Sequence, residues 1–256
     1  MRLVVPPGVF HPHSDTWMLA GLVHREDRIP GGDALDLCTG SGALAVATAQ
    51  AGARSVTAVD VSRRAVGAAW LNGLLNGVRV RPVRGDLFAP LAGRRFDAIV
   101  SNPPYLPAED DELPDSGPER AWEAGSDGRV LIDRIAAGAA AHLKPGGVVL
   151  MVQSSLCGVD RTLQALAAGG LEAEVAERRR GPLGPLLAAR ATELELRGLL
   201  APGQREEDLV AIKARLPEQR PLTQAHVDSS DGLRLQSRPR VASGSLGTDE
   251  SGADGF

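Results

Sequence analysis

The chain has 256 residues, of which 43% are hydrophobic, and a formal net charge of −4 at pH 7, so it can bury one substantial core and offers no electrostatic case for stable nucleic-acid binding. Its two cysteines, Cys38 and Cys157, are too few for a disulfide framework. Neither a signal peptide nor a run of about 18 uncharged apolar residues is recognisable, and we therefore expect a cytoplasmic protein that does not enter a membrane.

The first half of the sequence predicts alternating helices and strands. Apolar residues lie on one helical face from Thr16 to Val23, and Asp15, just before them, is the candidate N-cap. Further along, the pattern predicts a strand at 34–37, a helix at 43–51, a strand at 55–60, a helix that Ser62 caps and that runs to about Asn76, and an edge strand with Pro82 at 78–84.

The second half continues this alternation. The expected elements are a strand at 96–100, a helix at about 127–142 that Lys144-Pro145-Gly146-Gly147 stops, a strand at 147–152, and strands at 171–177 and 209–215 around a helical segment near 185–200. Strands that alternate with helices of this size imply an α/β fold, with a doubly wound, mostly parallel seven-stranded sheet and helices on both faces. From Pro217 to Phe256 small and polar residues dominate, and we expect a disordered tail.

The stretch Ser101-Asn102-Pro103-Pro104-Tyr105 directly follows the apolar run at 96–100. It is expected at the carboxyl end of a buried strand, where open α/β sheets place their chemistry. Asn102 offers an amide that can pair with a planar amide or amine, and the two prolines leave carbonyls that only accept. Tyr105 can cover a planar group with its ring. Taken alone, the stretch is also compatible with a rigid turn that ends a strand.

A glycine-bearing turn, Asp36-Leu37-Cys38-Thr39-Gly40-Ser41-Gly42, joins the first strand to the next helix. Gly40 and Gly42 allow a tight turn and close approach of a ligand to the backbone, while the helix amino terminus presents free N–H groups. With Ala45 they match the dinucleotide fingerprint G-x-G-x-x-A, and Asp60 lies near the distance at which an acid holds a ribose. The spacing alone is equally compatible with an ordinary strand-to-helix turn.

The acid before the glycines separates two classes of nucleotide. Asp36 would repel a pyrophosphate, whereas it attracts the ammonium of a methionine moiety, which favours S-adenosylmethionine over NAD. We expect Asp60 to accept the ribose hydroxyls, Asp86 to accept the adenine amino group, and Leu87 to pack on the adenine ring. Three acids at the ends of successive strands, followed by Asn-Pro-Pro-Tyr after the fourth, form a more specific pattern than any one of them.

This pattern resembles the class I S-adenosylmethionine-dependent methyltransferases, and within them the protein glutamine-N5 methyltransferases that modify the Gly-Gly-Gln loop of peptide-chain release factors. The similarity runs from about Gly8 to Arg215. The stretch 8–16 is similar to the short amino-terminal motif of the compact eukaryotic and archaeal members, and 121–128 is similar to their loop after the catalytic strand. The larger helical amino-terminal domain of the usual bacterial members is not recognisable.

The resemblance implies a division of the chain and a set of site residues. Residues 1–30 would cover the cofactor, residues 31–216 would form the methyltransferase domain, and residues 217–256 would be the tail. The residues implied to contact the cofactor or the substrate amide are Thr16, Asp36, Cys38, Asp60, Asp86, Leu87 and Asn102, with Pro103, Pro104 and Tyr105 beside the reacting amide. Two positions depart from the family pattern: Cys38 stands where many members have glycine, and Ala124 replaces the first glycine of a Trp-x-Gly-Gly loop.

Several alternatives stay open at this point. His11, His13 and Asp15 have an H-x-H-x-D spacing, but no further His or Cys follows at zinc spacing, and we expect no metal. Asn-Pro-Pro-Tyr also occurs in methyltransferases of base amino groups, and a small-molecule amine is a third acceptor class. Compact family members work with a small zinc-binding activator subunit, and the strand at 78–83 would be the edge that such a partner completes.

Overall fold

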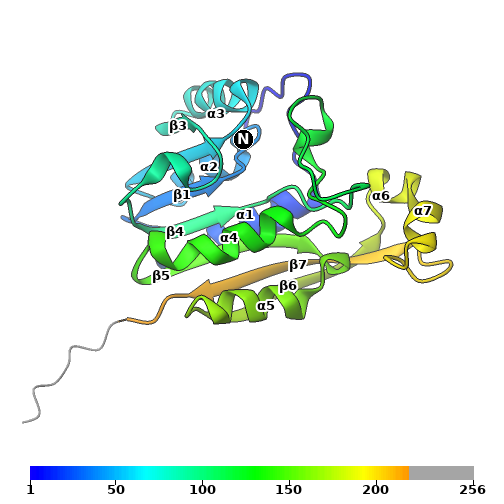
Figure 1. Ribbon diagram of the computed structural model, residues 1–256. Helices are drawn as coiled ribbons and strands as arrows, with labels where there is room; N and C mark the ends of the chain where they lie inside the picture. Colours follow the sequence, from blue (N-terminus) through cyan, green and yellow to red (C-terminus); the bar gives the residue numbers. More distant parts are fainter. Residues whose placement is uncertain (219–256) are drawn as a thin grey trace, which may run out of the picture. The chain divides into compact units, whose positions relative to one another are not determined.

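Within residues 1–218, the part of the chain that the computed structural model describes, seven strands form one sheet in the order β3-β2-β1-β4-β5-β7-β6 (Figure 1). The strands are β1 Asp33–Leu37, β2 Ser55–Asp60, β3 Val80–Arg84, β4 Phe96–Ser101, β5 Leu143–Ser154, β6 Glu172–Pro182 and β7 Glu206–Arg215. The first five strands pair in parallel, whereas β7 runs antiparallel to both of its neighbours. The predicted fold class is confirmed.

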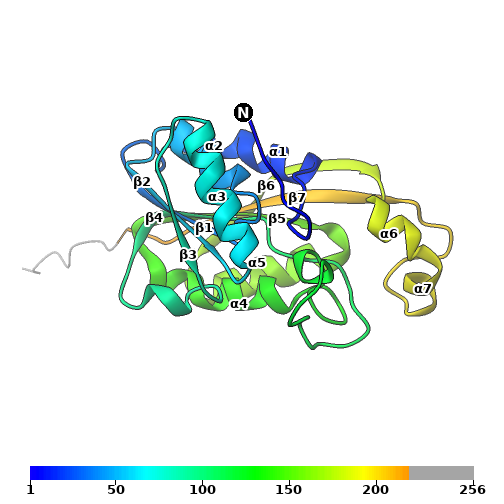
Figure 2. The ribbon, with the colours of Figure 1, turned by 90° about the horizontal axis from the view of Figure 1, so that it is seen from above.

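Helices cover both faces of this sheet, as the view from above in Figure 2 shows. They are α1 Ser14–Val23, α2 Ala43–Gln50, α3 Arg63–Leu75, α4 Val130–Ala139, α5 Val159–Ala168, α6 Pro185–Ala189 and α7 Ala191–Leu196. On one face α1, α2 and α3 pack against the sheet, and on the other face α4 and α5 do so, which gives two separate hydrophobic clusters. Strands β1, β2 and β4 are buried on both sides because they lie between these layers, which is why they appear as continuous apolar runs.

The two edge strands differ in how they are protected. Strand β3 is five residues long and carries Pro82, while β6 is eleven residues long and mostly exposed. A register shift between Val175 and Glu177 interrupts the pairing of β6 with β7. Three consecutive arginines, 178–180, then pair with acids on the same two strands. Charges and a bulge of this kind discourage edge-to-edge pairing with another chain.

Several local expectations need correction. Asp15 is not the N-cap of α1, because the helix begins at Ser14 and places Asp15 in its first turn. The helix expected at 127–142 is shorter, and β5 begins at Leu143, which pairs with Phe96 before Lys144–Gly147 shift the register. The segment near 185–200 contains two short helices, and β6 extends five residues beyond 177. Helix α5 was not expected.

Most of the expected tail, from Gln219 onward, lies outside the described residues. The described part of the chain contains no helix with the length and apolar character needed to cross a membrane.

Candidate active site

The residues predicted from sequence lie at the ends of four neighbouring strands. Cys38 comes directly after β1, Asp60 ends β2, Asp86 follows β3 and Asn102 follows β4, and these strands are adjacent in the order β3-β2-β1-β4. Because all four are parallel, their carboxyl ends meet at one edge of the sheet. The fold therefore brings the predicted residues to the same end of the molecule.

Asp36, near the carboxyl end of β1, has a buried carboxylate, one oxygen of which lacks a hydrogen-bond donor among the described residues. Its side chain is 1% exposed, and its Oδ2 accepts a hydrogen bond from Thr39 Oγ1 at 2.5 Å. Its Oδ1 is buried and has no partner among the described residues. Burial raises the pKa of this carboxyl to about 7. A buried carboxylate oxygen without a donor is stabilised when a cationic group donates to it, and the ammonium of a methionine moiety is such a group.

Asp60 is fixed by backbone groups of two different turns. Its Oδ2 accepts from Gly40 N–H at 3.0 Å, and its Oδ1 accepts from Ser62 N–H at 2.9 Å. Burial nevertheless raises its pKa. Since each carboxylate oxygen can accept a second hydrogen bond, the orientation suits a ligand diol such as a ribose.

The turn between β1 and α2 depends on its glycines for two reasons. Gly40 and Gly42 have φ values of 53° and 79°, which side chains seldom tolerate. A Cβ atom on Gly42 would also lie 2.6 Å from the Cα of Ala69 on α3, so the glycine permits the close approach of α2 and α3. The backbone of this turn is thereby held beside Asp60.

A hollow of about 290 Å³ lies beside the carboxyl end of β3, and Val61, Arg84, Gly85, Asp86 and Arg120 line it. Asp86 is half-exposed and accepts from Arg134 Nη2 at 2.6 Å, and the next residue, Leu87, has a φ of 44°. Such strained backbone at a strand end is typical of ligand sites. The hollow has the position expected for the adenine end of the cofactor, next to Asp60.

Cys38 occupies a backbone conformation that favours glycine. Its φ is 57°, in the left-handed region, and burial raises the pKa of its thiol well above the usual range, which argues against a nucleophilic role. The departure from the family pattern is thus accommodated by strain, because the backbone retains the conformation that a glycine would adopt freely.

Substitutions at Cys38 should separate this strain from side-chain chemistry. We expect Cys38→Gly to keep its affinity for S-adenosylmethionine and to change the free energy of unfolding by no more than about 1 kcal/mol. In contrast, Cys38→Val should lower the free energy of unfolding by about 1–3 kcal/mol and bind the cofactor more weakly, since a β-branched residue disfavours positive φ. Thermal unfolding and calorimetric titration measure both effects, and a valine variant as stable as the wild type would contradict this explanation.

Asn102 is held by residues of α1. Its Nδ2 donates to Asp15 Oδ2 at 3.0 Å and to Thr16 Oγ1 at 3.0 Å, so both amide hydrogens are used. Asp15 and Thr16 are 3% and 4% exposed, and within residues 1–218 no group donates to Asn102 Oδ1. The amide therefore presents its oxygen, a hydrogen-bond acceptor, on the side away from α1.

Tyr105 is anchored at both its hydroxyl and its backbone. Its hydroxyl donates to Asp15 Oδ2 at 2.9 Å, and burial, followed by the nearby Asp15 carboxylate, holds the pKa of this phenol well above its usual range. The Cys157 thiol, whose pKa burial raises to about 12, donates to the Tyr105 carbonyl at 3.3 Å. A Cβ atom on Gly128 would meet that carbonyl at 2.3 Å. The tyrosine is thus positioned by three separate segments.

The loop after Tyr105 keeps its pairing despite the alanine at position 124. Ala124 is fully buried, its N–H donates to the Leu106 carbonyl at 3.0 Å, and its carbonyl accepts from Val130 N–H at 3.0 Å. The buried Arg129 guanidinium then donates to the Gly158 carbonyl at 3.1 Å and to Thr162 Oγ1 at 3.0 Å. These contacts tie the loop to α5.

Sequence reasoning missed two residues at this site. Asp15 was considered as a helix cap and a metal ligand, whereas the structure uses its carboxylate to hold Asn102 and Tyr105. Cys157 was considered only as a possible disulfide partner, whereas its thiol contacts the Tyr105 backbone. The Asp15-Thr16 pair at a helix start was the available signal for the first, and nothing in the sequence indicates the second.

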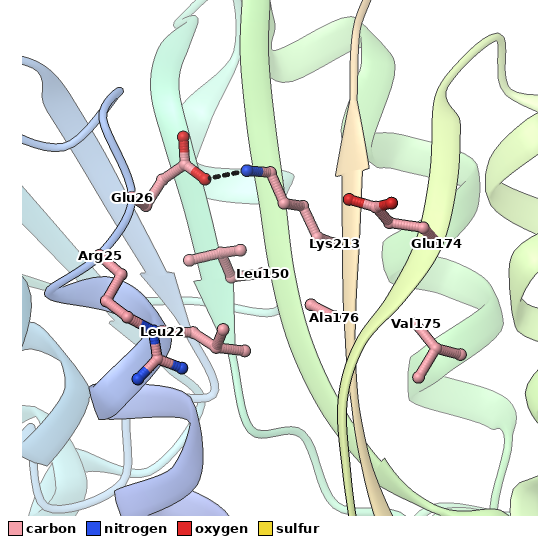
Figure 3. Close-up of a pocket in the computed structure, with 8 residues that line it drawn as sticks. All are labelled: Leu22, Arg25, Glu26, Leu150, Glu174, Val175, Ala176 and Lys213. Atoms are coloured by element: carbon pink, nitrogen blue, oxygen red, sulfur yellow. Dashed lines mark ion pairs between the residues drawn. The ribbon is translucent and has the colours of Figure 1, made fainter.

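A second hollow, of about 300 Å³, lies away from these residues, between the end of α1 and strands β5, β7 and β6 (Figure 3). Its buried acid, Glu26, faces Lys213 at an Nζ–Oε2 distance of 2.6 Å and also accepts from Arg215 at 3.1 Å. Because the buried charge is already paired, we assign this cluster to stability rather than to catalysis.

The hollow contains a matched pair of acids for testing that assignment. Glu26→Gln should lower the free energy of unfolding by about 1–3 kcal/mol, because two partly exposed cations lose a buried partner. Glu174→Gln is the control, since Glu174 lines the same hollow, is exposed, and forms no ion pair within residues 1–218. Urea unfolding of both variants measures the difference. Equal stabilities would show that the Glu26 pairs contribute nothing.

Comparison with known proteins gives consistent results. A family model described as the methyltransferase small domain matches residues 1–113. A putative protein N5-glutamine methyltransferase of Methanocaldococcus jannaschii is 35% identical over 195 residues, which cover 76% of this chain and 96% of that protein. A release factor glutamine methyltransferase of Gloeobacter violaceus is 38% identical over 161 residues, or 59% of this chain. The chain spans 56% of the length of that bacterial relative.

Solved structures agree at the level of the fold. The Mtq2–Trm112 complex of E. cuniculi, described as responsible for the methylation of the eRF1 translation termination factor, aligns with a TM-score of 0.54 at 20% identity. The alignment covers 81% of this chain and 98% of that one.

Proposed function

The chain belongs to the family of S-adenosylmethionine-dependent protein glutamine N5-methyltransferases, and from this premise we propose that it methylates the side-chain amide nitrogen of a glutamine in a protein. The proposed substrate is the Gly-Gly-Gln loop of a peptide-chain release factor, as the names of relatives indicate for those proteins. The single observation that carries the proposal is the orientation of Asn102, whose amide oxygen is left free to accept from an NH2 group.

The residues at the end of β4 would position the glutamine amide. One amide hydrogen would be accepted by Asn102 Oδ1 and the other by the carbonyl of Pro103, which accepts no hydrogen bond within residues 1–218. Two acceptors in the plane of the amide would hold both hydrogens and leave the nitrogen lone pair directed out of that plane. They would also stabilise the positive charge that develops on nitrogen. The Tyr105 ring would lie beside the amide, fixed by Asp15 and Cys157.

Bound S-adenosylmethionine supplies an electrophilic methyl group on its sulfonium. Asp36 would hold the ammonium of the methionine moiety, Asp60 the ribose hydroxyls, and Asp86 and Leu87 the adenine. For Asp86 this means exchanging its contact with Arg134 for one with the ligand. No strong general base is required if the proton leaves the amide nitrogen after methyl transfer, so the catalytic contribution of the protein is positioning and electrostatics.

Residues 1–30 would help to cover the cofactor. Asn72 of α3 binds the backbone of Val4 through both its amide groups, and Asn76 binds that of Arg2 in the same way. Thr16 contacts Asn102 from the same segment. In this proposal residues 1–30 form the covering segment and residues 31–216 the methyltransferase domain.

A small zinc-binding activator subunit is the proposed partner, docked on the edge strand β3 and on α3. Trp70 and Leu74 lie one turn apart on α3 and are 54% and 58% exposed, and Leu75 is 43% exposed. Exposed apolar side chains beside the free edge of a sheet are typical of an interface. Trp70→Glu should abolish co-purification of the subunit, whereas a fully active monomer purified alone would count against this partner.

Competing acceptor classes can be tested in one experiment. Methyl transfer from labelled S-adenosylmethionine should be measured on a release factor, on its Gly-Gly-Gln glutamine-to-alanine variant, and on total RNA and DNA. The proposal predicts label on the unmodified release factor alone. Label on nucleic acid would support methylation of a base amino group instead. If the assay includes the activator subunit and neither acceptor is labelled, the result would contradict the proposal.

A further inference from the structure

The side chain of Asn102 has two orientations that differ by half a turn of its terminal amide, and they offer opposite chemistry to a substrate. One presents the oxygen, which accepts, and the other presents the NH2 group, which donates. A glutamine amide nitrogen carries hydrogens that need acceptors, so only the first orientation binds it productively. Something in the protein must therefore fix which way the amide faces.

Asp15 has the chemistry to do this. Its carboxylate can only accept, and its Oδ2 lies 3.0 Å from Asn102 Nδ2 and 2.9 Å from the Tyr105 hydroxyl. A turned amide would place the Asn102 oxygen against this carboxylate, so that two acceptors would face each other in a buried site. Thr16 Oγ1, in contrast, can donate or accept and does not by itself distinguish the two orientations.

The carboxylate is itself held in one position. Its Oδ1 accepts from the Thr16 N–H at 2.6 Å and lies 3.3 Å from Thr16 Oγ1, while the residue is 3% exposed. Because the Thr16 N–H can only donate, the side-chain atom of residue 15 that faces it must be an acceptor. The second oxygen is therefore fixed toward Asn102 and Tyr105.

We propose that Asp15 is the positioning residue that sets acceptor specificity, by holding the Asn102 amide with its oxygen toward the substrate and thereby selecting an NH2-bearing side chain over a carboxylate. This inference rests on the proposed function, because it concerns the same glutamine. It assigns to α1, which comes before the cofactor-binding turn in the chain, the control of what Asn102 recognises.

The Asp15→Asn variant tests this role because it changes one oxygen to an NH2 group without changing shape. The backbone N–H of Thr16 still requires an acceptor, so the new NH2 group faces Asn102 and Tyr105. Asn102 should then turn its oxygen inward and present its own NH2 group to the substrate. The preference for glutamine over glutamate at the acceptor position should then decrease or invert.

The measurement is the ratio of dissociation constants for two release-factor forms, one with Gln and one with Glu in the Gly-Gly-Gln loop, in the presence of S-adenosylhomocysteine and of any required subunit. We expect the wild type to prefer the Gln form, and Asp15→Asn to reduce that preference by at least about tenfold or to invert it. The affinity for S-adenosylhomocysteine should change much less. Glu174→Gln, far from the site, should keep the wild-type ratio.

A double variant separates this role from a merely structural one. In Asp15→Asn/Asn102→Asp the carboxylate at position 102 accepts from the new NH2 group and again presents an oxygen to the substrate. Recovery of the Gln preference is expected for the double variant. The assignment is overturned if Asp15→Asn keeps the wild-type ratio or if the double variant recovers nothing. A wild type without any preference for the Gln form would instead overturn the proposed function, and this assignment with it.

Discussion

Asn102→Ala is expected to lower kcat/KM for methyl transfer to a Gly-Gly-Gln substrate by a factor on the order of 10²–10³, the usual effect of removing one electrostatic group from a reacting centre. The alanine removes the amide oxygen that no group within residues 1–218 occupies. In this variant the Asp15 carboxylate still accepts from the Tyr105 hydroxyl and the Thr16 N–H, so it is not buried without hydrogen-bond donors. The loss should therefore appear in catalysis more than in folding.

Single-turnover kinetics on purified Asn102→Ala would measure this effect, with cofactor affinity and thermal unfolding recorded on the same sample. Gln50→Ala is a matched control, because it removes an equivalent amide from an exposed position near the end of α2. We expect wild-type turnover for that control. An Asn102→Ala enzyme with full turnover would exclude the amide from the mechanism.

Asp36→Asn should have the largest effect on cofactor binding, raising the dissociation constant of S-adenosylmethionine by a factor on the order of 10². The change converts a buried carboxylate into a neutral amide at the position of its unpartnered oxygen. The neutral amide lacks the negative charge that would attract the ammonium of the ligand. Isothermal titration of both proteins with the cofactor gives the ratio directly.

The same substitution should change the pH dependence of stability in a defined direction. The pKa of Asp36 in the folded protein is about 7, raised by burial from an ordinary value of 3.8. The fold therefore binds a proton that the unfolded chain releases, and stability falls as pH rises from about 4 to about 7. In Asp36→Asn this decrease should be smaller, so that the variant without ligand gains stability relative to the wild type above about pH 7.

Cofactor affinity should respond to pH in the opposite sense. An ionised Asp36 is needed to hold the ammonium, so affinity for S-adenosylmethionine should weaken by up to about tenfold per pH unit as pH falls below 7 in the wild type. The Asp36→Asn variant should lack this dependence. A wild type whose affinity is constant between about pH 5.5 and 7.5 would show that this carboxyl does not contact the ammonium.

The parts of the fold that the sequence predicted are those in which a single physical signal dominates. The strand at 55–60 was predicted with its observed bounds, because both of its faces are buried and its apolar run is continuous. Ser62 was correctly predicted as an N-cap, since its hydroxyl accepts from Ala65 N–H. The sequence motifs also led to the correct family, which the archaeal relative confirms.

Other elements could not be predicted, because tertiary contacts decide them. Strand β6 is long but exposed and highly charged, so its sequence shows little alternation of apolar and polar residues from which its pairing with β7 could be predicted. Strand β5 begins early because Leu143 pairs with Phe96, a contact between residues far apart in the chain. At the site, the contact of Asp15 with Asn102 arises from an approach of α1 to the end of β4 across 87 positions of sequence. No local pattern encodes that contact.

In the proposed reaction the methyl group is placed on a glutamine amide nitrogen that Asn102 holds. The most direct test is fragmentation mass spectrometry of a release factor after reaction with the enzyme, S-adenosylmethionine and any required subunit. We expect one added methyl group, located on N5 of the glutamine in the Gly-Gly-Gln loop, and a far lower yield of this product with Asn102→Ala. A methyl group on any other residue or on the backbone, or an equal yield from the variant, would contradict it.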